Sequence, residues 1–158
     1  RHISISTCGL VPMIYRFADE EVQYNLAISL HASNDELRKE LMPVAKAYSL
    51  KELFAAIKYY SEKNNRRITF EYLLLKDVND QAKNADELKE LLHGINAYIN
   101  LIPYNTVKEK DYSSSGERAT LNFYDMLKKR GVAVTLRQKK GDDIDAACGQ
   151  LRANYNKG

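Results

Sequence analysis

Cys148 is the residue of this chain with the clearest capacity for chemistry. It is one of two cysteines among 158 residues and lies in the run GDDIDAACGQL, residues 141–151, between an alanine and a glycine. A thiol that small neighbours leave accessible can act as a nucleophile once it ionises. Free cysteines are also among the most often buried side chains, so Cys148 could equally be a small packing group. The local sequence leaves both interpretations open.

Polar side chains also collect where strands are predicted to end. Ser29 and His31 close the apolar run 26–32 and could hydrogen-bond a ligand, or His31 could cap the strand end structurally. Ser6 ends another run in the same way, and Cys8, which follows it closely, is interpreted as a packing residue. The histidines and cysteines do not have the spacing of a zinc site, and no glycine-rich phosphate-binding motif is found.

Composition indicates a globular domain without a membrane span. The chain is 44% apolar and 28% charged, and it has no run of 18 apolar residues. Two widely separated cysteines favour reduced thiols and a cytoplasmic location. The net charge is +3, and residues 128–140 hold six basic side chains and no acidic one. Such a stretch favours phosphate groups, or it is simply a solvated helix end and strand edge.

The elements that must position these residues alternate along the chain. Nearly continuous apolar runs predict strands covered on both faces. Capping-box patterns predict helices after Ser33 and Ser49, and apolar spacing predicts helices over 86–92 and around 123–127. The predicted strands are 3–7, 25–30, 67–75, 98–103 and 132–136.

Alternating strands and helices give an α/β fold with mainly parallel strands. Five strands suit either a doubly wound sheet or part of a barrel. In both architectures ligands bind at the carboxyl ends of the strands, where the polar residues collect.

Five segments together resemble one family in order and spacing. This family is the radical S-adenosylmethionine (SAM) methyltransferases that methylate carbon-2 of an adenine in 23S ribosomal RNA and in certain transfer RNAs. The resemblance implies an α/β fold that is the C-terminal part of a partial (βα) barrel, with about five mainly parallel strands, helices packed outside, and residues 1–158 as a single domain. The segments are STCGLVP (6–12), LAISLHA (26–32), EYLLLKDVND (71–80), NLIPYN (100–105) and GDDIDAACGQL (141–151).

The resemblance implies a role for six residues. Cys148 would be the methyl carrier: its thiolate takes a methyl group from one SAM, and a radical made by reductive cleavage of a second SAM removes hydrogen from the methylated cysteine. The resulting carbon radical then adds to the adenine ring. The SAM site would be lined by Ser6, Ser29, Leu30, His31 and Asn105.

Parts of the family pattern do not occur in this sequence. A CxxxCxxC motif is absent, so no residues here are expected to hold the family's [4Fe–4S] cluster, and a glycine-glutamate-proline segment is absent too. The chain is therefore expected to be the C-terminal portion of an enzyme whose first barrel strands, cluster motif and N-terminal domain lie elsewhere. It is expected to be inactive alone, and the full-length enzyme would need an external electron donor.

Three alternatives remain. The first is the related branch that methylates adenine carbon-8 and confers antibiotic resistance. The second is an RNA-binding module without chemistry, supported by the basic stretch 128–140. The third is a stand-alone thiol enzyme, which would need a base near Cys148.

Overall fold

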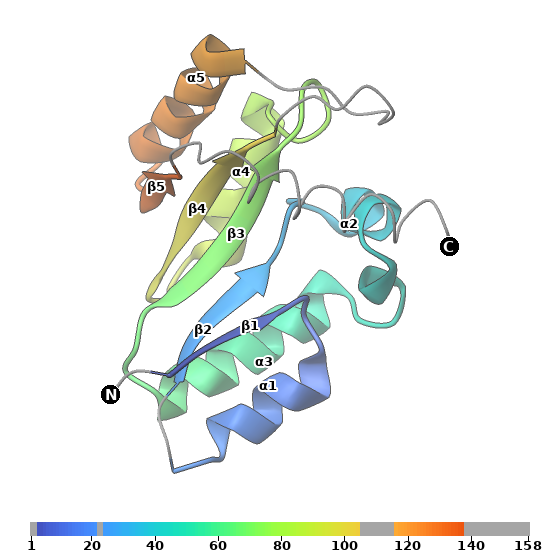
Figure 1. The fold of residues 1–158 in the computed structure, drawn as a ribbon, viewed down its shortest axis with the longest axis vertical. Coiled ribbons are helices and arrows are strands. Elements are labelled where there is room, and N and C mark those ends of the chain that lie inside the picture. Colours follow the sequence, from blue (N-terminus) through green and yellow to red (C-terminus); the bar gives the residue numbers. More distant parts are fainter. Residues whose placement is uncertain (1–2, 22–23, 105–115, 138–158) are drawn as a thin grey trace.

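Five parallel strands form one sheet in this protein (Figure 1). The computed structural model describes residues 3–21, 24–104 and 116–137. Each strand predicted from the sequence is present, and its ends are displaced by at most two residues. The strands are β1 (Ile3–Thr7), β2 (Tyr24–Ser29), β3 (Ile68–Leu74), β4 (Ala97–Pro103) and β5 (Val134–Leu136).

The order of the strands decides between the two expected architectures. A doubly wound sheet reverses its strand order so that helices reach both faces. Here the order in space is the order in sequence, β1-β2-β3-β4-β5, and right-handed crossovers then bring successive helices to the same face. This is the arrangement of a barrel segment. The crossover helices are α1 (Val11–Ala18), α3 (Leu50–Lys63), α4 (Ala82–Leu92) and α5 (Gly116–Lys129).

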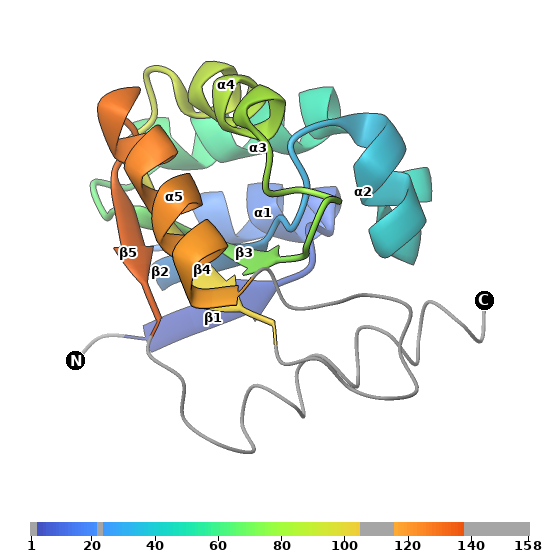
Figure 2. The ribbon, with the colours of Figure 1, turned by 90° about the horizontal axis from the view of Figure 1, so that it is seen from above.

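The helices pack on the sheet through one continuous core. Figure 2 shows α1, α3 and α4 along one side of the strands. Phe54 of α3 stacks on Phe70 of β3 with ring centroids 5.3 Å apart, and Phe123 of α5 stacks on Tyr72 of the same strand at 5.7 Å. A shorter helix, α2 (Asp35–Leu41), is followed by the 3-10 turn η1 (Pro43–Lys46). Strand β3 therefore carries aromatic contacts to both halves of the helical layer.

Burial alternates along the strands rather than being continuous. On β2, Leu26 and Ile28 are buried towards the helices, while Asn25 and Ser29 are partly exposed. On β3 and β4 the same alternation holds until the last residues. The prediction of strands covered on both faces is therefore wrong in this detail: within the described residues the second face carries polar side chains. We call it the open face.

Some helix starts differ from the predictions. The capping box of Ser49 is confirmed, since its Oγ accepts a hydrogen bond from the Glu52 amide at 3.1 Å. Asn34, not Ser33, caps α2, with its Oδ1 accepting from the Leu37 amide at 2.8 Å. Helix α4 begins at Ala82 rather than near residue 86, and α1 was not predicted.

The missed helix α1 has an explanation in its sequence. Pro12 lies in its first turn, where the missing amide hydrogen costs nothing, so this proline is compatible with the start of a helix. The polar segment 106–116, whose run of serines predicts a loop, lies outside the described residues except for Gly116, where α5 begins. Among the residues that are described, no helix has the length and apolar character to cross a bilayer.

Ser49, the N-cap of α3, and Ser61, within the same helix, provide a matched pair of substitutions that tests how this helix is capped. Replacing Ser49 with alanine should lower the free energy of unfolding by about 1 kcal/mol, because it removes the cap of the first turn. Ser61, in the last turns of the same helix, has a buried hydroxyl without a hydrogen-bond partner among the described residues. Ser61→Ala should therefore leave stability unchanged or raise it. Chemical denaturation of both variants checks this, and equal losses would contradict the assignment of the cap.

Candidate functional site

Four of the five predicted cofactor-binding residues lie at the carboxyl ends of β1 and β2. Ser6 is exposed on β1, and Ser29 is the last residue of β2. Both belong to the open face, since Ser6 is in register with Ala27, two residues before Ser29. Leu30 and His31 follow directly and are buried.

The remaining predicted site residues, Asn105 and Cys148, lie outside the described residues. Their roles as SAM contact and methyl carrier stay predictions.

Leu30 contributes to the site through its backbone amide and carbonyl, not through a polar side chain. Its side chain is completely buried in the core under the helices. Its amide donates to the Glu71 carbonyl at 3.0 Å, and its carbonyl accepts from Arg38 Nε at 3.2 Å. Leu30 therefore fixes the path of the chain between Ser29 and His31.

Arg38 of α2 holds the ends of β1 and β2 together. Its guanidinium is fully buried and donates from Nη2 to the carbonyls of Cys8 at 2.8 Å and Ser29 at 3.0 Å, in addition to the bond to Leu30. Its Nη1 has no hydrogen-bond partner among the described residues. Burial lowers the pKa of Arg38, although nearby Asp35 opposes the shift. The sequence analysis missed this residue, because one arginine in the charged run DELRKEL carries no local signal.

The chain beside Cys8 passes close to this guanidinium. Gly9 has φ +104°, and a Cβ at this position would lie 2.9 Å from Arg38 Nη2. Only glycine combines that backbone angle with so little space. The side chain of Cys8 itself is exposed, so its interpretation as a packing residue is wrong.

His31 joins the end of β2 to the end of β3. Its backbone is left-handed, with φ +58°, and its Nδ1 accepts a hydrogen bond from the Leu73 amide at 2.9 Å. Its carbonyl accepts from Asn79 Nδ2 at 2.9 Å, and the same Nδ2 donates to the Leu73 carbonyl at 2.8 Å. Asn79 is fully buried and also accepts from the Leu75 amide at 2.8 Å. One asparagine therefore fixes the turns after both strands.

The His31 ring is neutral near pH 7. Burial, and secondly the positive charge of Arg38, lower its pKa to about 4. Because Nδ1 accepts a hydrogen bond, the proton of the neutral ring is on Nε2, which remains a donor. The structural interpretation of His31 is thus confirmed for Nδ1. The interpretation as a ligand contact stays a prediction for Nε2.

A row of polar side chains crosses four strands on the open face. Ser29, Glu71, Asn100 and Thr135 are in register on β2, β3, β4 and β5. Thr135 Oγ1 donates to Asn100 Oδ1 at 3.1 Å, and Asn100 Nδ2 donates to Glu71 Oε2 at 3.1 Å. Burial raises the pKa of Glu71, while the bond from Asn100 and the charge of Arg137 oppose the shift. We call these four residues the polar row.

Asn100 and Thr135 were missed by the sequence analysis. The signal that could have identified them is the alternation of apolar and polar residues in strands. On β4 it is interrupted after Asn100 by Ile102, which is buried on the same face, and β5 has only three residues, too few to show an alternation around Thr135.

Ser33 connects the β2–α2 turn to α4. Its Oγ donates to Glu87 Oε1 at 2.8 Å and accepts from Asn84 Nδ2 at 3.0 Å. Asn34 also donates to Glu87 Oε1, at 3.2 Å. A cavity of about 300 Å³ lies beside these residues, between α2 and α4. These hydrogen bonds hold the turn between β2 and α2 against α4.

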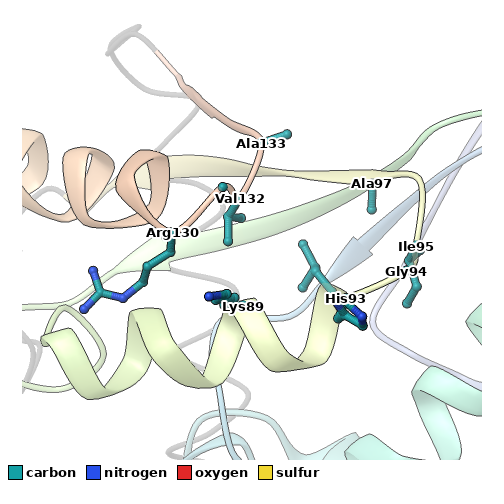
Figure 3. A pocket seen from close by; sticks show the side chains of 10 residues that line it. Lys89, His93, Gly94, Ile95, Ala97, Arg130, Val132 and Ala133 are labelled. Atoms are coloured by element: carbon teal, nitrogen blue, oxygen red, sulfur yellow. The ribbon is translucent and has the colours of Figure 1, made fainter.

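A second cavity, shown in Figure 3, lies at the other end of the strands, where β4 and β5 begin. It has a volume of about 260 Å³, and Lys89, His93 and Arg130 line it near the beginnings of β4 and β5. Arg130 belongs to the basic stretch but is engaged by Asp86 at 2.5 Å and by the Met126 carbonyl at 2.9 Å. This cavity is therefore remote from the carboxyl ends of the strands, and its arginine is already bound.

In the described ranges, no three histidine, cysteine, aspartate or glutamate side chains gather to hold a metal ion.

Comparison with known proteins gives similarity over nearly the whole chain, although no family model matches it. The chain is 56% identical over 160 residues to the "Probable dual-specificity RNA methyltransferase RlmN" of Streptococcus pneumoniae, covering 99% of this chain and 44% of the relative. It is 52% identical over 155 residues to the protein of the same name from Clostridium beijerinckii, covering 98% and 44%. The chain thus spans less than half the length of these curated relatives.

Solved structures agree with the sequence comparison. A radical SAM methyltransferase from Sphaerobacter thermophilus superposes with a TM-score of 0.86 at 46% identity, covering 96% of this chain and 44% of the other. A domain of a pyruvate-formate lyase-activating enzyme from Bacteroides vulgatus gives 0.62 at 19% identity, which shows a common fold alone. The barrel-segment architecture is confirmed by the first of these structures.

The neutral state of His31 predicts a pH dependence of stability. The unfolded chain binds a proton at His31 near pH 6.5, whereas the folded chain does so only near pH 4. Between these values the unfolded state binds more protons, so stability falls as the pH falls. From pH 7 to pH 5 the free energy of unfolding should drop by about 2 kcal/mol from this group.

Two variants isolate the contribution of His31. His31→Asn, which tolerates a left-handed backbone, should remove this share of the pH dependence, and His93→Gln on the exposed end of α4 should not. The ring-carbon NMR shifts of His31 give a direct readout. Titration of this ring near pH 6.5 in the folded protein would contradict the proposed burial.

Proposed function

Because this chain belongs to the radical SAM RNA methyltransferase family, we propose that it is the C-terminal portion of an enzyme that methylates carbon-2 of an adenine in 23S ribosomal RNA and in transfer RNA. The observation that carries the proposal is 52–56% identity over nearly the whole chain to relatives named as dual-specificity RNA methyltransferases. On this proposal the enzyme acts in the cytoplasm and receives electrons from an external donor.

The carboxyl ends of β1 and β2 fit a SAM molecule. SAM presents ribose hydroxyls, an ammonium and a carboxylate, which need hydrogen-bond donors and acceptors. The exposed Ser6 hydroxyl, the Ser29 hydroxyl and the Nε2 of His31 offer such groups on one rim. Bound SAM would supply the methyl group and, with a reducing cluster, radical chemistry.

The chain's own residues contribute positioning and one nucleophile. Arg38 and Asn79 hold the Ser29–His31 segment rigid, so that little ordering is needed when a ligand binds. His31 stays neutral near pH 7, with its proton on Nε2. Cys148 is proposed to accept the methyl group on its sulfur and to carry it to the adenine. Asn105 is proposed to complete the SAM site.

A [4Fe–4S] cluster does not fit the residues of this sequence. The family's cluster uses three cysteines, whereas this chain has two, Cys8 and Cys148, and one of these is assigned to methyl transfer. Within the proposed enzyme the cluster would be held by residues outside this sequence.

The carbon-8 branch and a non-catalytic RNA-binding module are the competing functions. The names of the curated relatives support the dual-specificity carbon-2 branch over carbon-8. The ion pair between Arg130 and Asp86 neutralises one charge of the basic stretch 128–140, which was the support for an RNA-binding module.

A Cys148→Ala variant tests the proposal. In cells that carry the full-length gene, we expect 2-methyladenosine in digested 23S ribosomal RNA and transfer RNA, and its complete loss in the variant, because the methyl carrier is gone. Mass spectrometry of the nucleosides measures both. Cys8→Ala is the matched control and should retain methylation.

The same experiment separates the alternatives. Appearance of 8-methyladenosine would assign the protein to the carbon-8 branch. Wild-type levels of methylation in Cys148→Ala would refute the role of this thiol. RNA binding that survives the substitution in a protein that never methylates would favour the binding module.

A further inference from the structure

Glu71 is a charged side chain on the open face that the proposed function does not yet use. Its neighbour in register on β2 is Ser29, one of the predicted SAM contacts. The carboxylate is half-buried, and burial raises its pKa. A carboxylate in such a place is costly unless something compensates for its charge.

The polar row holds this carboxylate in a defined orientation. The hydroxyl of Thr135 donates to the amide oxygen of Asn100, so the amide nitrogen of Asn100 must face Glu71. Glu71 Oε2 accepts that bond at 3.1 Å. Thr135 therefore fixes the amide group of Asn100, and Asn100 in turn orients the carboxylate of Glu71.

The compensation within the described residues is incomplete. Glu71 Oε1 has no hydrogen bond to any described residue, and the single neutral donor, Asn100, occupies only the other oxygen. Arg137 is close enough to lower the pKa of Glu71, but the two form no ion pair there and Arg137 is exposed. Oε1 can therefore accept a hydrogen bond from a ligand, or lie against a cationic one, beside Ser29.

The charge of the cofactor suits this position. SAM carries a sulfonium in addition to its ammonium and carboxylate, so it has one more positive charge than S-adenosylhomocysteine, the thioether left after methyl transfer. A half-buried carboxylate interacts more strongly with a charge than a solvated one does. A negative side chain at the rim therefore favours the reactant over the product.

We propose that Glu71 is a cofactor-binding residue whose negative charge makes the site prefer the sulfonium cofactor SAM to S-adenosylhomocysteine. The inference rests on the proposed function, because it requires SAM to bind at the rim formed by β1 and β2. It adds a determinant of cofactor selectivity, held in place by Asn100 and Thr135.

Calorimetric titration of the full-length protein with SAM and with S-adenosylhomocysteine tests this inference. Glu71→Gln keeps the shape and removes the charge, and it should lower the ratio of the two affinities about tenfold, the effect of one partly screened charge. Glu62→Gln removes the same charge from an exposed position on α3 and should leave the ratio unchanged. Thermal unfolding reports whether each variant folds.

The outcomes are distinct. An unchanged ratio in Glu71→Gln, or an equal loss of both affinities, would overturn the inference while leaving the proposed function intact. Failure of the wild-type protein to bind SAM would overturn both. If Glu71→Gln does not fold, Thr135→Val keeps the carboxylate but frees Asn100, and it should lower the ratio by a smaller factor. No change in that variant would again count against the inference.

Discussion

The buried guanidinium of Arg38 is the interaction on which the rest of the site depends. A charged group without water depends on hydrogen bonds from its surroundings, and here the carbonyls of Cys8, Ser29 and Leu30 accept from its Nε and Nη2. Those carbonyls belong to the last residue of β2 and to the first residues beyond β1 and β2, where the backbone leaves the sheet. Arg38 therefore replaces the missing ladder bonds and fixes both chain exits relative to α2.

A second buried side chain extends this bracing to the next strand. Asn79 uses its amide group to bind His31, Leu73 and Leu75, which makes the exits of β2 and β3 one unit. His31 belongs to the same unit through Nδ1, and burial, together with the positive charge of Arg38, keeps its ring neutral. The side chains that hold the rim together are Arg38, Asn79 and His31. They belong to polar types that are less often buried in proteins than apolar ones, but here they are buried.

The sequence predicted the strands well because their apolar runs reflect burial directly. It left the barrel and the doubly wound sheet undecided, since strand order is a property of the crossovers and not of any one segment. Arg38 and Asn79 were not identified, because each lies in a polar local context and links a nearby strand end to one that is distant in the sequence. Arg38 binds Cys8, 30 residues away, and Asn79 binds His31, 48 residues away. Asn100 was hidden by the buried isoleucine that interrupts the alternation on β4, and Thr135 lies in a strand of three residues, which is too short to show an alternation.

Because the strands lie side by side in the order of the sequence, the sheet can form progressively while the chain is being synthesised. Each strand pairs with the one before it, so every segment can dock on structure that the ribosome has already released. The contacts of Arg38 and Asn79 are all complete by residue 79, before β4 begins at Ala97. The rim at β1–β3 can thus take its final shape during translation, and the later βα unit adds to a template that already exists.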